Sequence, residues 1–312
     1  MTPAGTASDG RSPRSSSSDV PAPPPRRRGT PLTPPAVVQL GCRHYDVMTR
    51  ALVMGIVNRT PDSFYDQGAT YDLASAVDRA AQLVADGADI IDVGGMKAGS
   101  GDDVTVAEEL DRVVPTVARL AERFDVAISV DTWRAEVAEA AYAAGAVLGN
   151  DISGFADPAY LATAARHGAS VVATHIRLRP RIDDPDPRYP DDDVVGAVEC
   201  FLADRLEMAL LAGIPAAGVL FDVGLDLGKT TPQSLELLRA LDRFAAMGQT
   251  LLLSASNKGF LGDTLGLPLG EREDASLAAV AFGVAAGCRV VRVHDVARAR
   301  RAVDTLAAVL AA

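Results

Sequence analysis

Short apolar runs rich in Val and Ile alternate with longer Ala-rich segments from about residue 50 to the end of the chain. The short runs are typical of strands that are buried on both faces, as in a parallel sheet. They lie at residues 51–57, 89–94, 126–130, 146–150, 169–174, 217–222, 250–255 and 289–293. The longer segments have the periodicity of helices with one apolar face. They lie at residues 73–86, 106–122, 133–144, 157–166, 194–212, 232–246, 271–286 and 296–310.

The number of these units indicates the fold class. Eight strands, each followed by a helix, within about 260 residues are expected of an α/β protein that forms a single (β/α)8 TIM barrel. A doubly wound open sheet is the alternative, but eight regular units favour closure. No dinucleotide-binding glycine fingerprint follows the first strand, which further weakens that alternative. The polar, proline-rich segment 176–193 predicts a long loop after the fifth strand, either a mobile lid or a solvated insertion.

The first 36 residues differ in composition from the rest. They hold nine of the 19 prolines, a serine run at 15–18 and an arginine triplet at 26–28. Such a segment cannot bury enough apolar surface to offset the entropy of ordering, so it predicts a disordered tail. It has no apolar stretch of the kind that a secretory signal requires. We therefore expect a tail over 1–36 and a barrel domain over 37–312.

The net charge narrows the choice of partners. The chain carries −11 at pH 7, and the five Arg and two Asp of the tail contribute +3, which leaves about −14 on the barrel domain. An acidic body argues against nucleic acid or an anionic membrane as the main partner. No run approaches the roughly 20 apolar residues of a membrane span. Cys42, Cys200 and Cys288 are odd in number and lack metal-site spacing, which favours reduced thiols in a cytoplasmic protein.

Polar residues stand where the predicted strands end. In a barrel these ends meet at one mouth. The residues concerned are Asn58, Asp131, Asn150, Asp151, His175, Asp222, Ser254, Ser256, Lys258, Arg292 and His294. Singly, several have simpler interpretations: Asp131 could be a helix N-cap, and His175 is more often structural than catalytic. Together they predict a binding site, because unpaired buried polar groups cost a few kcal/mol each.

The chemistry of these residues suggests a kind of ligand. The carboxylates of Asp131 and Asp222 and the amide of Asn150 suit a flat heterocycle with amino and lactam groups. Arg292 and His294, with the loop that follows Asn58, offer the donors and positive charge that a phosphate or diphosphate needs. The sequence thus predicts a nitrogen heterocycle that carries an anionic tail.

The motifs at these strand ends resemble those of the dihydropteroate synthase family. The resemblance is carried by Met-Gly-Ile-Val-Asn-Arg-Thr-Pro-Asp-Ser-Phe (54–64), Ile-Asp-Val-Gly-Gly (91–95), Ser-Val-Asp-Thr-Trp-Arg-Ala-Glu-Val-Ala (129–138), Asn-Asp-Ile-Ser-Gly (150–154) and Arg-Val-His-Asp-Val (292–296). It implies a (β/α)8 transferase of folate biosynthesis that joins 6-hydroxymethyl-7,8-dihydropterin diphosphate to p-aminobenzoate and releases pyrophosphate. It also implies magnesium (Mg2+) as cofactor and a homodimer formed through the last helices.

The resemblance also implies residue roles. Asp131, Asn150, Asp222 and Lys258 would bind the pterin ring, with Ser256 beside them. Arg292 and His294 would hold the diphosphate, and Asn58 would help to position Mg2+. In the implied mechanism, Mg2+ and Arg292 stabilise the departing pyrophosphate, while Asp131 and Asp222 stabilise the cation that forms on the pterin. Asp131, Lys258 and Arg292 are therefore the expected catalytic residues.

The chain departs from the family pattern in four loops. Arg59 replaces a usual Val, and Met96-Lys97-Ala98-Gly99-Ser100 replaces Glu-Ser-Thr-Arg-Pro. The usual Asp-Pro-Gly-Ile-Gly-Phe-Gly-Lys appears as Asp222-Val-Gly-Leu-Asp-Leu-Gly-Lys229, and the usual Ser-Arg-Lys as Ser256-Asn257-Lys258. Lys97 and Arg59 could restore positive charge, although a Lys does not replace the bidentate fork of an Arg.

These departures leave alternatives to a synthase. The pattern is similar to the divergent second copy of the synthase in some actinobacteria. One alternative is therefore a pterin-binding paralogue without normal synthase activity, which uses another amine as its second substrate or serves as a binding or regulatory protein. A methyltetrahydrofolate-dependent methyltransferase on the same barrel is another, and Arg292 and His294 argue against it.

Overall fold

The computed structural model describes Met1 and residues 36–60, 72–96, 104–182 and 184–312. These residues from 36 onward belong to one compact unit, Leu32–Ala312. Apart from Met1 and Ala36, the predicted tail of residues 1–36 lies outside the described residues. Residues 61–64 of the first motif and 97–100 of the second loop lie outside them as well.

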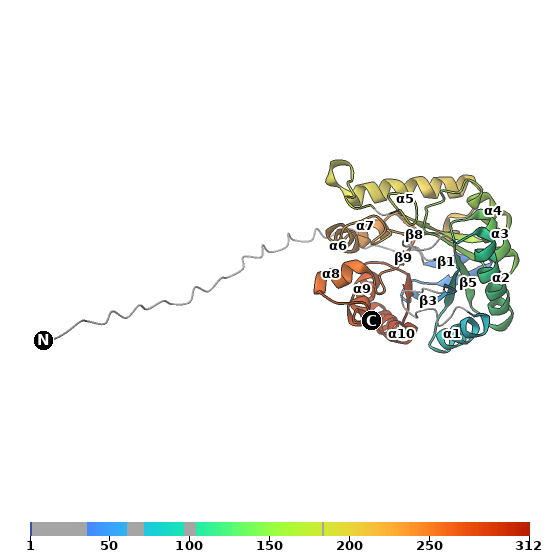
Figure 1. The fold of residues 1–312 in the computed structure, drawn as a ribbon, viewed down its shortest axis with the longest axis horizontal. Helices are drawn as coiled ribbons and strands as arrows, with labels where there is room; N and C mark the ends of the chain where they lie inside the picture. The colour runs from blue at the N-terminus through green and yellow to red at the C-terminus, as the bar shows by residue number, and fades with distance from the viewer. Residues whose placement is uncertain (2–35, 61–71, 97–103, 183) are drawn as a thin grey trace. The chain divides into compact units, whose positions relative to one another are not determined.

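Eight parallel strands close into a barrel, which confirms the predicted (β/α)8 TIM fold (Figure 1). Around the barrel they run in the order β10-β3-β4-β5-β6-β7-β8-β9. Their bounds are β3 (Leu52–Asn58), β4 (Ile90–Gly94), β5 (Ala127–Asp131), β6 (Leu148–Asp151), β7 (Ser170–Thr174), β8 (Val219–Asp222), β9 (Thr250–Leu253) and β10 (Val290–Val293). Each strand overlaps one of the predicted apolar runs.

The helices pack around the outside of the strands (Figure 1). They are α1 (Leu73–Ala85), α2 (Val106–Arg123), α3 (Ala135–Ala143), α4 (Tyr160–Arg166), α5 (Val194–Leu211), α6 (Thr231–Arg239), α7 (Leu241–Ala245), α8 (Gly259–Leu265), α9 (Glu273–Ala285) and α10 (Val296–Ala311). Two features differ from the prediction. The single helix expected over 232–246 is interrupted at Ala240, and α8 follows β9 where the sequence predicted only a loop.

A hairpin that the sequence analysis missed closes the N-terminal end of the barrel. It pairs β1 (Val37–Leu40) with β2 (Arg43–Asp46). Val38 and Leu40 pack in one buried cluster with an inward residue from every barrel strand. The hairpin is also joined to β7, because the Gly41 N–H donates to the Ser170 hydroxyl at 3.1 Å. With this end filled, a ligand has access from the opposite end, where the strands terminate.

The inward face of each strand changes from apolar to polar over two residues. Ile90, Leu148, Leu220 and Val290 belong to the apolar floor that the hairpin covers. Two residues further along the same strands stand Asp92, Asn150, Asp222 and Arg292. Side chains alternate between the two faces of a strand, so both sets face the interior. A polar layer therefore lies directly above the floor, at the C-terminal mouth.

The polar segment 176–193 forms the long connection from β7 to α5, as predicted. Among its described residues the only regular element is one 3-10 turn, Pro190–Asp192. Arg177 and Asp184 form an ion pair within it, and the Tyr189 hydroxyl donates to the Gly228 carbonyl at 3.1 Å. Across the described ranges, none of the helices combines the length and apolar character that crossing a membrane requires.

Candidate functional site

A charged network joins four strands in the polar layer. Arg292 on β10 donates from Nε to Asp92 Oδ2 at 2.7 Å and from Nη2 to Asp131 Oδ2 at 2.8 Å. The Asn150 amide on β6 donates to the same Asp92 oxygen at 3.0 Å. Asp92 is fully buried, and its Oδ1 has no hydrogen-bond partner among the described residues. Since such an oxygen is costly to leave unpaired, it marks a place for a donor on a ligand.

The two predicted carboxylates have altered acidities. Burial raises the pKa of Asp131 to about 7, against the lowering effect of Arg292 and with a further increase from the nearby Asp92. Burial likewise raises the pKa of Asp222, and the positive charge of Lys258 opposes it. The Asp222 Oδ1 accepts the Gly224 N–H at 2.8 Å. Titratable carboxyls with raised pKa values in a cavity are typical of functional sites.

Lys229 and Lys258 are hydrogen-bonded to backbone carbonyls of the loops that follow β7 and β8. Lys258 Nζ donates to the Leu225 carbonyl at 2.6 Å. The buried Lys229 Nζ donates to the carbonyls of Gly224, Leu227 and His175 at 2.7, 3.1 and 3.2 Å. Burial lowers the pKa of Lys229 to about 7, and it lowers the pKa of Lys258 as well. Together the lysines tie the loops that follow β7, β8 and β9 to one another.

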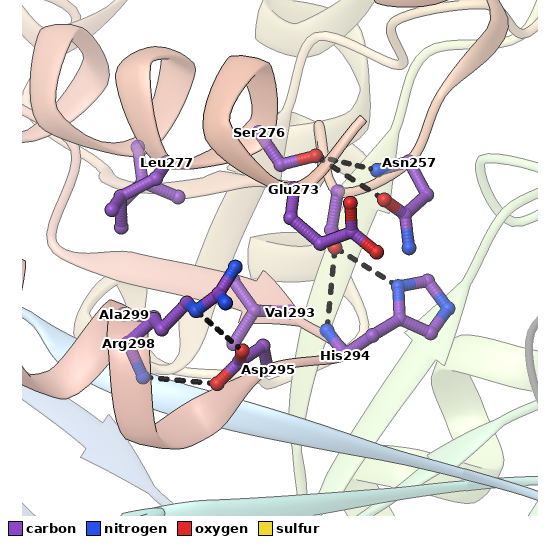
Figure 2. A pocket seen from close by; sticks show the side chains of 11 residues that line it. Asn257, Glu273, Ser276, Leu277, Val293, His294, Asp295, Arg298 and Ala299 are labelled. Carbon is purple, nitrogen blue, oxygen red and sulfur yellow. Dashed lines mark hydrogen bonds and ion pairs between the residues drawn. The ribbon is translucent and has the colours of Figure 1, made fainter. Parts of the chain in front are cut away.

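Ser256 follows β9 and His294 follows β10, and their side chains meet at the rim between these strands. Figure 2 shows His294 beside a neighbouring pocket. The His294 Nδ1 lies 2.9 Å from the Ser256 hydroxyl, which also accepts the His294 backbone N–H at 3.3 Å. Beside them a small pocket extends between α9 and α10, lined by Glu273 and Arg298 among others. The rim therefore presents an imidazole and a hydroxyl that are already paired and fixed in orientation.

Asn58 lies beside Asp131 because the residue between them is a glycine. A Cβ added to Gly94 would lie 3.2 Å from Asn58 Oδ1 and 3.6 Å from Asp131 Cβ. The described residues contain no group of three or more His, Cys, Asp or Glu side chains that could hold a metal ion. Mg2+ is commonly bound by one or two protein oxygens together with substrate phosphates. The Asn58 amide oxygen fits that limited protein share.

Comparison with known proteins decides the family. The family model described as pterin binding enzyme matches residues 54–294, which include every site residue described above. The chain belongs to this family. It is 47% identical over 264 residues to a Mycobacterium tuberculosis protein named inactive dihydropteroate synthase 2, covering 83% of each chain. It is 38% identical over 265 residues to the dihydropteroate synthase of a Synechocystis species, covering 84% of this chain and 91% of that one.

The solved structures agree with this assignment. The Yersinia pestis dihydropteroate synthase, crystallised with a sulfonamide drug, superposes with a TM-score of 0.84 at 35% identity. The match covers 88% of this chain and 99% of that one. The pterin-binding barrel that the family resemblance implied is thus supported both by sequence relatives and by fold.

Within this pterin-binding enzyme, two predicted mouth residues, Asp151 and His175, have structural tasks, while Asp131 belongs to the site network. Asp131 is not the N-cap of a helix, because α3 begins at Ala135 after Arg134 and Asp131 binds Arg292. The Asp151 carboxylate accepts the backbone N–H groups of Ser153 and Phe155 at 2.6 and 3.0 Å, so it shapes a turn. The His175 ring packs edge-on against Phe201, and burial lowers the pKa of His175 to about 2. His175 is therefore neutral and structural.

Two site residues of the barrel were missed, and each has a sequence signal. Asp92 interrupts an otherwise apolar strand at the inward position, in the same phase as Asn150 and Arg292 on their strands. Lys229 is one of only three lysines in the chain, and the 30 basic residues are otherwise all arginine. All three lysines, Lys97, Lys229 and Lys258, follow the end of a barrel strand. A residue type that is rare in the chain and stands only after strand ends in the sequence indicates a function at those ends.

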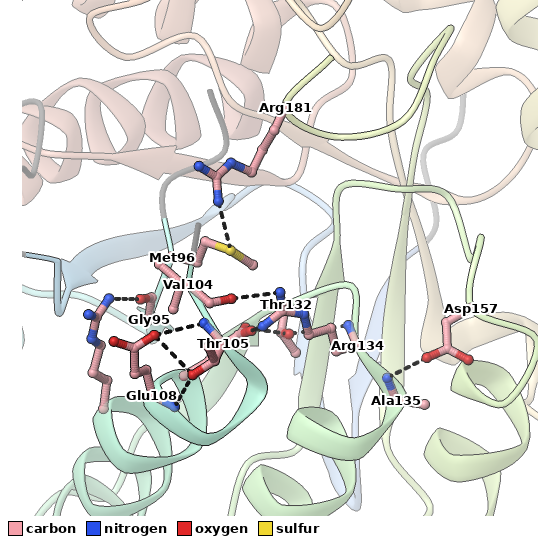
Figure 3. A network of polar contacts seen from close by, with 12 residues as sticks. Gly95, Met96, Val104, Thr105, Glu108, Thr132, Arg134, Ala135, Asp157 and Arg181 are labelled. Carbon is pink, nitrogen blue, oxygen red and sulfur yellow. Dashed lines mark hydrogen bonds and ion pairs between the residues drawn. The ribbon is translucent and has the colours of Figure 1, made fainter. Parts of the chain in front are cut away.

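The rewritten first loops of the pterin-binding barrel are anchored on α2. Arg59 Nη1 donates to the Arg112 carbonyl at 2.9 Å, which directs this guanidinium toward α2. Arg112 Nη1 in turn donates to the Gly95 carbonyl at 3.0 Å, at the start of the altered second loop. At its other end Arg134 Nη2 donates to the Val104 carbonyl at 2.8 Å (Figure 3). Arginines from the barrel wall thus hold both ends of that loop.

A buried carboxylate, Glu109, connects this anchor to the end of β5, where Asp131 stands. Glu109 on α2 accepts the Thr132 hydroxyl at 2.6 Å and Arg134 Nη1 at 2.8 Å. Thr132 directly follows Asp131, so Glu109 also fixes the end of β5. From across the mouth, Arg181 Nη1 lies 3.5 Å from Met96 Sδ (Figure 3). The loop that lacks the family's arginine is therefore approached by a different one.

Proposed function

We propose that the protein is a dihydropteroate synthase-type transferase, which joins 6-hydroxymethyl-7,8-dihydropterin diphosphate to p-aminobenzoate. The observation that carries the proposal is the buried Asp92–Arg292–Asp131 network with its unpaired Asp92 oxygen. A pterin ring carries an amino group and ring N–H groups on one edge and a lactam oxygen beside them. That edge matches a buried wall of carboxylates and an amide with a lysine at its far side.

Each side chain on this wall has its own role in binding the pterin ring. Asp92, Asp131 and Asp222 accept the N–H groups of the ring, and Asn150 holds Asp92 in place. Lys258 donates to the opposite edge. When the bond to the diphosphate lengthens, positive charge grows on the pterin methylene, and the carboxylates of Asp131 and Asp222 stabilise it in a site from which water is excluded.

The diphosphate is held at the rim. His294 and Ser256 offer paired, fixed polar groups, and Asn58 would supply one oxygen to Mg2+. Bound there, Mg2+ would neutralise charge on the departing pyrophosphate. Two donors of Arg292 already serve Asp92 and Asp131, so its contribution to the diphosphate is chiefly its positive charge, stabilising the leaving group.

The altered loops after β3 and β4 favour a second candidate function, a pterin-binding protein without synthase activity. The chain shares 47% identity with a protein named as inactive, and its four departures from the family pattern include the loops after β3 and β4. The Arg59 guanidinium is turned toward α2, where it donates to the Arg112 carbonyl. A pterin-binding paralogue that keeps the ring site and lacks the p-aminobenzoate reaction accounts for both observations.

One experiment separates the two functions. The protein is titrated by calorimetry with 6-hydroxymethyl-7,8-dihydropterin diphosphate and Mg2+, and p-aminobenzoate is then added while pyrophosphate release is followed. Binding followed by pyrophosphate release supports the transferase. Binding without release supports the paralogue. No binding contradicts both.

A loop graft locates the defect if release is absent. Replacing Met96–Ser100 with Glu-Ser-Thr-Arg-Pro should then raise pyrophosphate release by at least about a hundredfold, because transition-state donors in such sites are each worth that much. The same graft in an Asp222→Asn background is the control and should remain inactive. A graft that binds the pterin and releases nothing would exclude this loop as the cause.

The proposal includes a cytoplasmic homodimer. The three cysteines are free thiols, which supports a reducing compartment. Exposed apolar side chains on the last helices, Phe282, Val309 and Leu310, support association through that face. Sedimentation analysis tests it: Phe282→Glu should shift the protein from dimer to monomer, and a wild-type monomer would contradict the assembly.

A further inference from the structure

The segment that carries Lys258 is joined to the neighbouring loop by a carboxylate, Asp226. Both Asp226 carboxylate oxygens lie 3.3 Å from the Phe260 backbone nitrogen, which donates to them, two residues after Lys258. The Asp226 N–H donates to the Ser234 hydroxyl at 3.2 Å. Lys258 Nζ makes the reciprocal contact, to the carbonyl of Leu225. Two links therefore run in opposite directions between the loop after β8 and the turn after β9.

The backbone at Asp226 shows that this arrangement carries a conformational cost. Its φ is +64°, in the left-handed region that glycine adopts freely and other residues disfavour. The family pattern has a glycine at this position, so a residue without strain was available. Asn257, where the pattern has Arg, is also a non-glycine residue in the left-handed region, with a φ of +59°. Its side chain is buried against Ser276 (Figure 2).

We propose that Asp226 is a positioning residue for Lys258: its carboxylate fixes the turn after β9 against the loop after β8 and gives Lys258 a second anionic neighbour besides Asp222. The inference rests on the proposed function, because it names what holds the lysine of the pterin site. Where the family pattern has a glycine in the loop after β8, this chain has Asp226, whose carboxylate is hydrogen-bonded to the turn after β9. This contact fixes the position of Lys258 and places a negative charge near it.

The charges around Lys258 support this role. The groups that face it are Asp222 and Asp226 with Lys229 from the β8 side, Arg292 from β10 and Asp131 from β5. Burial lowers the pKa of Lys258, and the carboxylates of Asp222 and Asp226 oppose that effect. Asp222 also belongs to the ring site and is the acceptor that a bound pterin would occupy. Asp226 then remains as a carboxylate neighbour of Lys258 that opposes the effect of burial.

The scarcity of lysine makes a direct test practical. In protein labelled with ¹³C at lysine Cε, only three side chains give signals, and Lys97→Arg and Lys258→Arg assign them. Asp226→Asn keeps an oxygen that can accept the Phe260 N–H and removes the charge. Asp226→Gly removes both and relieves the backbone strain. Asp263→Asn is the matched control, because Asp263 also links the loop after β8 to α8, through the Thr231 hydroxyl at 2.7 Å, without neighbouring Lys258.

The expected result has two parts. In Asp226→Asn the Lys258 titration moves to lower pH, while in Asp263→Asn it stays at the wild-type position. Affinity for 6-hydroxymethyl-7,8-dihydropterin diphosphate falls about tenfold in Asp226→Asn and further in Asp226→Gly, as the loss of a charged donor predicts.

Other outcomes have distinct meanings. A Lys258 titration that is the same in wild type and Asp226→Asn overturns the inference, and so does an altered titration with unchanged pterin affinity. If wild-type protein does not bind the pterin and the Lys258 titration still moves, the proposed function fails and the positioning of Lys258 by Asp226 stands.

Discussion

Replacing Arg292 with alanine is expected to lower the free energy of unfolding by about 3–5 kcal/mol and to abolish pterin binding. The physical reason is the position of Asp92, which is fully buried and has its Oδ2 paired with the Arg292 guanidinium. Without that cation, a carboxylate would remain in the interior with no opposite charge beside it. Asp92, left with only the Asn150 amide as a donor, would either take up a proton or draw water into the barrel, and both change the proposed pterin-binding wall.

The comparison that isolates this effect uses a second arginine on the same side of the barrel. Arg298 pairs with Asp295 at 3.4 Å on the surface, with half of its side chain exposed. Arg298→Ala should cost less than about 1 kcal/mol, as exposed pairs do. Urea denaturation of both variants measures the difference. Equal stabilities would show that the Arg292 network does not support the fold.

A double variant tests the assignment of the cost to Asp92. Adding Asp92→Asn to Arg292→Ala removes the buried charge and keeps a side chain of the same shape. Part of the lost stability should return, which gives a favourable coupling energy in the double-mutant cycle. Simple additivity of the two changes would contradict a direct pairing. The stability of Arg292→Lys should lie between those of the wild type and Arg292→Ala, because lysine supplies the charge but cannot donate to two carboxylates as the guanidinium does.

The barrel could be predicted from the sequence because its signals are local. Each strand lies in a short, mostly apolar run, and glycines such as Gly87 and Gly287 separate a helix from the next strand. Eight repeats of that unit leave few topologies. The hairpin of Val37–Asp46 gives no comparable local signal, because its two four-residue strands are stabilised by the barrel floor. Only the closed barrel creates the surface that they cover. The seven-residue α8 contains two glycines, so its helical propensity is low and its packing decides.

The position of the site could be predicted from the sequence, but the hydrogen-bond and ion-pair partners within it could not. That Asp131, Asn150, Asp222 and Arg292 share one mouth follows from strand ends alone. That Arg292 binds Asp131 depends on barrel closure, which places β10 two strands from β4 and three from β5. Asp92 was passed over because a carboxylate inside an apolar run is not at a strand end. Its phase relative to Asn150 and Arg292 identifies it once the inward face is known.

Pterin affinity is expected to fall about tenfold for each pH unit below 7, because Asp131 must be ionised to accept an N–H from the ring. Burial raises the pKa of Asp131 to about 7, so the acceptor form is lost as the pH drops through that value. The suitable probe is 6-hydroxymethyl-7,8-dihydropterin, whose lack of phosphate removes the titration of the diphosphate from the measurement. Calorimetry at pH 6 in two buffers of different ionisation heat should show release of close to one proton on binding.

The same group predicts the opposite trend for the stability of the unliganded protein. A carboxyl whose pKa is about 7 when folded and about 4 when unfolded binds more protons in the folded state between those values. Its contribution to stability is therefore present at acidic pH and is lost as the pH rises toward 7, by at most about 1.4 kcal/mol per unit. Asp131→Asn should remove both the pH dependence of binding and this slope. Asp222→Asn, whose own pKa is also raised by burial, is the control that separates the two carboxyls. If Asp131→Asn retains the proton release and Asp222→Asn loses it, then Asp222 is the group whose ionisation controls the pterin site.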